Sequence, residues 1–164
     1  MKFSSLKSKH YLHNASLKAL LNEIANGSTY GKLLSNPGVS IGSSSKAKVK
    51  TNAFDYVKDG VFHTVAAAET AFTATEHDIA DKSEAIFVVS CKLADDSIVI
   101  TMGDPVLSED GSAVAPATPE GHLKLGEVKI VTDGAVFDAS TTLLDAATLT
   151  ATFTSKTDIF SGLA

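Results

Sequence analysis

Histidines and acids with the spacing of metal ligands occur at two places in the sequence. His10 and His13 would share one side of a helical turn, where two imidazoles can chelate a metal ion, but no acid or cysteine nearby completes a site. The run 77–84 offers one imidazole and three carboxylates, yet it lacks the central glycine of a calcium-binding loop. Its ligand-type residues are His77, Asp78, Asp81 and Glu84. We therefore predict surface histidines, a solvated loop, no metal site and no cofactor.

Residues able to catalyse a reaction are equally isolated along the chain. Asp95 and Asp96 fall in an expected hairpin turn, where aspartates are favoured for backbone geometry rather than for acid–base work. Cys91, the one cysteine, stands in an apolar run and lacks a neighbouring base, so we expect an inert core thiol. Neither a nucleophile elbow nor a phosphate-binding loop occurs. The sequence predicts a protein that is not an enzyme.

Residues 1–47 are predicted to form a basic N-terminal arm with one short helix at about residues 15–26. Four apolar side chains recur at the i, i+3, i+4 and i+7 spacing of one helix face: Leu17, Leu20, Leu21 and Ile24. A helix of about ten residues does not persist alone in water, so this stripe must pack against the body, a sister chain or a partner. The glycine- and serine-rich stretch 28–48 is expected to be a linker or an extended arm.

Residues 48–154 show the alternation and turn signals of a β domain. Asp59–Gly60 separates two short strand-like runs and predicts a hairpin. A second hairpin, the expected centre of the core, joins the doubly buried run Glu84–Leu93 to Ile98–Met102 through a turn at 94–97. Short strands separated by turns at this spacing predict a compact antiparallel β-sandwich or barrel-like domain.

The second half of this domain adds a long polar loop and two further strands. After the loop Ser108–Gly121, the run Leu123–Ile130 is strand-like, and Gly126 within it predicts a bulge or a close backbone contact. Threonines alternate with apolar residues from Thr148 to Thr154, which predicts a strand with one face in water. Residues 155–164 are expected to form a C-terminal tail.

Charge divides unevenly along the chain. Residues 1–50 hold eight lysines and one acid, 8 − 1 = +7, whereas residues 51–164 hold six lysines and eighteen acids, 6 − 18 = −12. The lysines either keep a tail in solution or dock the arm on an acidic surface, an attraction that salt would screen. The lysines proposed to bind a partner, together with the apolar stripe, are Lys7, Lys9, Lys18 and Lys32.

Composition excludes several classes of function. The chain contains no Arg, Gln or Trp, so it lacks the bidentate fork that reads guanine and phosphate and the best stacking platform for bases. Sequence-specific nucleic-acid binding is therefore not expected. No run approaches the roughly 18 apolar residues of a membrane span, and the N-terminus lacks the apolar region of a signal peptide. One cysteine allows no intrachain disulfide, which suits synthesis in a reducing cytoplasm.

The order of turns and strand-like runs along the chain resembles that of small virion proteins of tailed bacteriophages. The resemblance lies in Ile41–Thr51, Phe54–Tyr56 and Asp59–Gly60, and again in Pro116–Val128, where a proline-rich loop and a glycine precede a strand. It covers about residues 40–154 and involves turns and strands rather than reactive residues. These segments look like those of capsid-decoration (cement) and head-fibre proteins, which combine an N-terminal attachment segment with a compact β domain.

The resemblance implies a virion structural protein that is made in the host cytoplasm and resides on the capsid surface. Its partner would be the major capsid protein of a tailed phage, with the arm on the shell and the β domain facing outward. A homotrimer would suit the three-fold positions of an icosahedral shell. One alternative is a receptor- or glycan-binding module of a fibre or tail, although the sequence offers few aromatic platforms. The other is an enzyme, which would need a cleft with converging acids.

Overall fold

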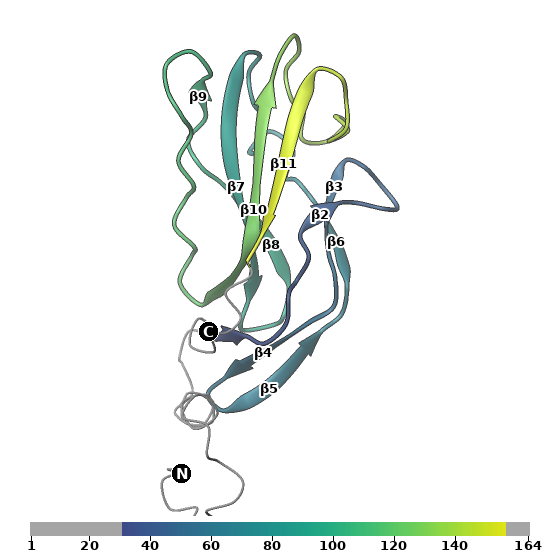
Figure 1. The fold of residues 1–164 in the computed structure, drawn as a ribbon, viewed down its shortest axis with the longest axis vertical. Coiled ribbons are helices and arrows are strands. Elements are labelled where there is room, and N and C mark those ends of the chain that lie inside the picture. The colour runs from purple at the N-terminus through teal and green to yellow at the C-terminus, as the bar shows by residue number, and fades with distance from the viewer. Residues whose placement is uncertain (1–30, 157–164) are drawn as a thin grey trace, which may run out of the picture.

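The computed structural model describes residues 31–156, which form eleven β-strands and no helix (Figure 1). The largest sheet is antiparallel and runs along the long axis of the molecule. Its strands, in spatial order, are β11 (Leu149–Ser155), β10 (His122–Thr132), β7 (Ser83–Lys92) and β8 (Ile98–Met102), and β9 (Val106–Leu107) also pairs with β7. We call this the main sheet.

Two smaller antiparallel sheets complete the body. The first contains β2 (Ser40–Ile41), β3 (Lys48–Thr51) and β6 (Ala68–Ala71). It lies against the main sheet, with β2 beside β11 and β6 beside β8. The second, at one end of the molecule, contains β1 (Lys32–Leu33), β4 (Phe54–Lys58) and β5 (Val61–Val65).

The core is formed by the main sheet and both smaller sheets. Every second residue of β7 points into it, from Ala85 to Cys91, as the period of two in a strand requires. Phe87 is fully buried and meets Phe72 and Phe137 edge to face, with ring centroids 5.1 and 6.4 Å away. The mainly-β prediction is confirmed, and the sheets are layered as in a sandwich.

The hairpins predicted from turn residues are present. Asp59 and Gly60 have φ of 50° and 77°, so β4 and β5 are joined by a two-residue turn with both residues left-handed, for which Asp–Gly is suited. β7 pairs with β8 across residues 93–97, and β7 is buried on nearly its whole length. β11 alternates between half-buried and exposed residues, and its exposed residues are Thr150, Thr152 and Thr154.

The structure differs from the sequence expectations in two respects. None of the three sheets closes into a barrel, because each described sheet ends in an edge strand. The stretch 28–48, expected to be a linker or an extended arm, contributes β1 and β2 from Gly31 onward, and its Leu33 and Val39 are buried in the core. Two-residue strands bounded by glycine and proline leave too short a periodic signal to detect. The predicted helix at 15–26 and the tail beyond Lys156 lie outside the described residues.

Candidate binding surfaces at the two ends of the body

Of the eight residues predicted to bind a partner, the described part of the chain contains one. Lys32 lies in β1, opposite Val57 of β4. The others lie outside the described residues: Lys7, Lys9, Leu17, Lys18, Leu20, Leu21 and Ile24. What the structure does establish is the place where the arm joins the body.

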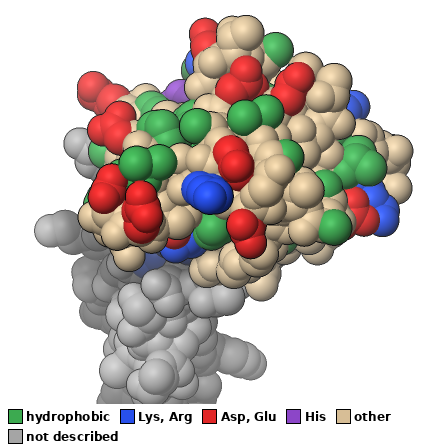
Figure 2. Space-filling view, turned by 90° about the horizontal axis from the view of Figure 1, so that it is seen from above, with side chains coloured by type: hydrophobic (Ala, Val, Ile, Leu, Met, Phe, Trp, Pro, Cys, Tyr) green, Lys and Arg blue, Asp and Glu red, His purple; other side chains and the backbone are tan. Residues whose placement is uncertain are grey.

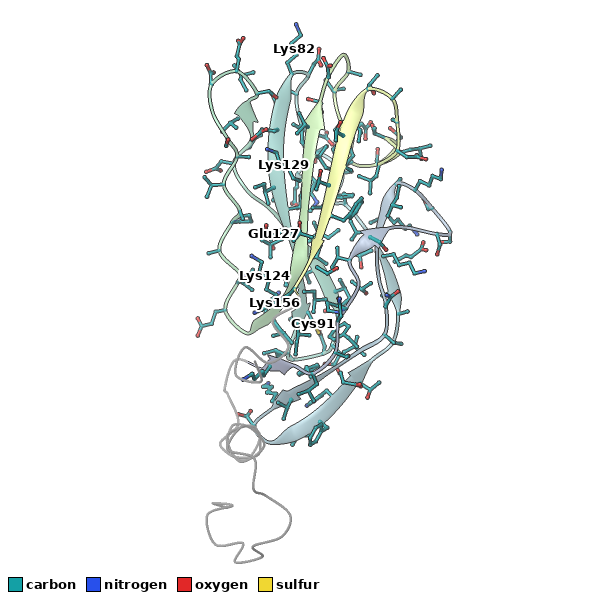
Figure 3. All side chains as sticks on the ribbon, viewed as in Figure 1. Lys82, Cys91, Lys124, Glu127, Lys129 and Lys156 are labelled. Carbon is teal, nitrogen blue, oxygen red and sulfur yellow. The ribbon has the colours of Figure 1, made fainter. Side chains whose placement is uncertain are left out.

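The arm joins the body beside the β4–β5 turn. The antiparallel register pairs Lys32 with Val57, so Gly31 stands level with Lys58, next to the turn. Gly31 also lies against Leu93, whose Cδ2 is 3.0 Å from the place a Cβ would take. At the other terminus of the described chain, the N–H of Lys156 donates to the carbonyl of Leu125, and Figure 3 shows Lys156 near Cys91, toward the same end.

A buried tyrosine fastens the β4–β5 hairpin to the main sheet. Tyr56 of β4 is fully buried and donates its hydroxyl to Asp96 Oδ1 at 2.5 Å, in the β7–β8 turn. His63 of β5 stacks on the Tyr56 ring at 4.6 Å, and its Nδ1 lies 3.8 Å from Asp96 Oδ2. Burial, the hydrogen bond to Asp96 and the charge of that carboxylate all raise the pKa of Tyr56 above its ordinary value.

Tyr56→Phe is expected to lower the free energy of unfolding at pH 7 by about 1–3 kcal/mol, because it removes a hydrogen bond to a charged group. Since the pKa of Tyr56 is higher in the folded state than in the unfolded state, the parent protein loses stability as the pH rises above about 10. The variant should lose less over the same pH range. Urea unfolding at pH 7, 9 and 10.5 checks both effects, and a parallel decline of the two proteins would contradict this assignment.

The opposite end of the body is rich in carboxylates. Figure 2 looks down on this end and shows acidic side chains spread among apolar ones. Asp81 Oδ1 accepts the N–H groups of Lys82 and Gly134, both at 2.8 Å, and so ties two loops together. Lys82 lies at the far tip of the molecule (Figure 3).

Beside this tip lies an open groove of about 490 Å³. It offers carboxylate, ammonium and hydroxyl groups over an apolar floor, and its lining residues are Asp81, Lys82, Leu107, Ser108, Glu109, Val131, Thr132 and Asp133. Leu107 is 45% exposed, whereas the Thr132 hydroxyl is buried and engaged by the backbone of Ala80 and Ser83. The groove combines groups that could bind a polar ligand, but no residue pattern in the sequence indicated it.

The outward face of the main sheet carries paired charges. Lys124 Nζ lies 2.5 Å from Glu127 Oε1 on β10, and Lys129 Nζ lies 2.8 Å from Glu84 Oε2 on β7 (Figure 3). Glu84 also accepts the N–H of Ala113 at 2.6 Å, and these bonds hold the pKa of its carboxyl below the usual range. The Lys129–Glu84 pair joins β10 to β7, and the bond from Ala113 to Glu84 fixes the 108–121 loop to the sheet, so Glu84 has a structural role.

The ligand-type residues of the run 77–84 do not converge on one point. His77 Nδ1 accepts the N–H of Thr73, Asp78 accepts that of Ala139, and Glu84 is engaged as described above. Among residues 31–156, no group of three or more His, Cys, Asp and Glu side chains could hold a metal ion. His10 and His13 lie outside this part of the chain.

The remaining reactive residues have local partners. Cys91 is fully buried, and burial together with Asp96 and Asp95 raises its thiol pKa to about 11, far from that of a nucleophile at neutral pH. Asp95 accepts the Ser97 hydroxyl at 2.6 Å, and with Lys92 this lowers its pKa to about 2. Asp95 therefore shapes the β7–β8 turn, as predicted.

A further carboxylate organises the β2–β3 loop. Glu69 of β6 accepts the N–H and hydroxyl groups of Ser43 and Ser44, and these bonds lower its pKa to about 2. The serine triplet is therefore a loop that a neighbouring strand fixes in place.

Comparison with protein-family models, with curated proteins and with solved structures gave no match for this chain. Among the residues that the structure describes, no helix has the length and apolar character needed to cross a membrane.

Proposed function

We propose that this chain is a virion structural protein that decorates and stabilises the capsid of a tailed phage. The N-terminal arm binds the major capsid protein, and the β body faces outward. The chain acts as a homotrimer at three-fold positions of the shell. In this role the protein binds and reinforces, and it carries out no reaction.

The observation that carries the proposal is the separation of charge between the arm and the body. Residues 1–30 hold four lysines and one acid, 4 − 1 = +3, whereas residues 31–156 hold ten lysines and seventeen acids, 10 − 17 = −7. The arm joins the body beside the β4–β5 turn, and the acidic tip around Lys82 lies at the other end. Such a layout favours a basic segment held on an acidic surface and an acidic end held away from it.

The groove beside Lys82 supports a second candidate function. Its three carboxylates, the Lys82 ammonium and the Ser108 hydroxyl could accept and donate hydrogen bonds to a polyhydroxylated ligand, and the groove lies at the end opposite the arm. A receptor- or glycan-binding module of a fibre or tail would place its site there.

Neutralising the arm is expected to weaken shell binding about tenfold or more, because each exposed charge pair contributes about 0.2–1 kcal/mol. The variant changes four lysines to glutamine in the full-length chain: Lys2, Lys7, Lys9 and Lys18. Binding is measured by co-sedimentation with empty shells of the major capsid protein from the phage whose genome carries this gene. The effect should shrink as salt rises from 0.05 to 0.5 M, in line with a Debye length of about 10 Å at 0.1 M.

A control variant with the same change in net charge separates the arm from general electrostatics. It changes four lysines of the described residues 31–156 to glutamine: Lys46, Lys48, Lys50 and Lys82. Equal binding of the two variants would contradict the role given to the arm. Absence of any binding by the parent chain would reject capsid decoration. Glycan binding by the parent chain and by Lys82→Glu would then be compared to test the groove.

A further inference from the structure

The outer strand of the β4–β5 hairpin is an unprotected edge. Within the described residues β5 pairs with β4 alone, and its sequence, Val61–Val65, contains neither a charge nor a proline. Val61 is 57% exposed and Phe62 64% exposed, although both are large and apolar. Edge strands in stable proteins are normally protected by a lysine, a proline, a bulge or a helix or loop that packs over them. Because β5 has no lysine, no proline and an exposed apolar surface, we expect another segment to pack over it.

The chain that could supply the cover leaves the body at the same place. Gly31 stands level with Lys58 on the β1 side of β4, and Phe62 stands opposite Val57 on its other side. Two strand spacings therefore separate Gly31 from β5, about 10 Å at the usual 4.8 Å between strands. Ile24 precedes Gly31 by seven residues, which can span up to about 23 Å. The apolar stripe of the arm is thus within reach of Phe62.

We propose that the stripe formed by Leu17, Leu20, Leu21 and Ile24 seats on the face of the β4–β5 hairpin that carries Phe62, in its own chain. The stripe needs an apolar surface in order to persist as a helix, and the hairpin exposes one. A tether of seven residues holds the two at an effective concentration in the millimolar range, so weak contacts suffice. Charge agrees as well, since Asp55 and Asp59 of the hairpin are exposed and the net charge of the arm is positive.

This seating divides the arm into two parts. The apolar stripe fixes the arm to the body, and the residues before it carry Lys2, Lys7 and Lys9 away from the hairpin. The contact between the stripe and the hairpin forms within one chain and requires no capsid shell. Its absence would therefore not contradict binding of the arm to a capsid.

The test is tryptic cleavage of the full-length protein after Lys18, followed by mass spectrometry. We expect Phe62→Ser to accelerate this cleavage about fivefold or more, because proteolysis follows the population of the open form. Cleavage after Lys7 and Lys9, before the stripe, should keep its rate. The matched control is Val136→Ser, which changes a side chain that is 61% exposed and lies outside the hairpin.

Further measurements show whether the stripe covers the hairpin and whether it comes from the same chain or from a second copy. The double change Leu20→Ser and Leu21→Ser should accelerate cleavage as much as Phe62→Ser does, and combining the variants should add little more. Equal rates for the parent, Phe62→Ser and Val136→Ser, with unchanged melting temperatures, would overturn the proposal. Protection that is lost on tenfold dilution would also overturn it, since the covering arm would then belong to a second copy.

Discussion

Phe87→Ala is expected to lower the free energy of unfolding by about 3–5 kcal/mol, the cost of deleting a buried aromatic ring and leaving a cavity. Phe87 is fully buried in the middle of β7. Its ring meets Phe72, Phe137 and the imidazole of His77 edge to face, with centroids between 5.1 and 6.4 Å. Phe72 and His77 lie in the β6–β7 loop and Phe137 lies in the β10–β11 loop, so the cavity would loosen the contact between the main sheet and both loops.

Urea unfolding followed by circular dichroism measures the change, since the chain has no tryptophan for fluorescence. Domains of this kind are stable by about 5–15 kcal/mol, so the variant should unfold at far lower urea. Two variants frame the result. Phe87→Leu keeps most of the volume and should cost less than about 1.5 kcal/mol, and Val136→Ala shortens an exposed side chain at little cost. A Phe87→Ala protein as stable as Val136→Ala would show that the aromatic cluster does not hold the core.

The elements that could be predicted from sequence are those whose signal is local. Asp59–Gly60 encodes its hairpin in two residues, because both positions require a left-handed backbone that these residues accept. The apolar run of β7 and the threonine alternation of β11 carry the strand period directly. Local patterns also placed Asp95 in a turn and Cys91 in the core.

The features that escaped prediction depend on contacts between distant segments. Leu33 lies in the two-residue strand β1, and Val39 directly precedes the two-residue strand β2. Both contact distant partners, β4 in the case of Leu33 and Ser155 in the case of Val39. The hydrogen bond between Tyr56 and Asp96 joins residues that are 40 positions apart in the sequence, and neither residue type predicts the other as its partner. The groove beside Lys82 is assembled from three separate loops and strand ends. The exposure of Phe62 is likewise a property of the edge position of β5, which a periodic pattern does not reveal.

Gly126 was predicted to mark a bulge or a close approach of backbones, and the structure confirms both. The register of β10 against β7 shifts between Lys124 and Gly126. A Cβ on Gly126 would lie 2.3 Å from the carbonyl oxygen of Thr154 and 2.8 Å from Val39 Cγ2. The first neighbour is the backbone of the paired strand β11, so it cannot turn aside as a flexible side chain would.

Gly126→Ala is therefore expected to cost about 3 kcal/mol, at the upper end for overpacking. Relief of the clash requires β11 to move away from β10, which would also strain the hydrogen bond of 2.7 Å from the Val39 N–H to Ser155 Oγ. Amide exchange should then accelerate at Thr152–Ser155 more than in β7. The control is Gly121→Asn, where φ is +73° and the space is open, because asparagine tolerates a left-handed backbone. If Gly126→Ala proved no less stable than Gly121→Asn, β11 would be held to the sheet more loosely than its register implies.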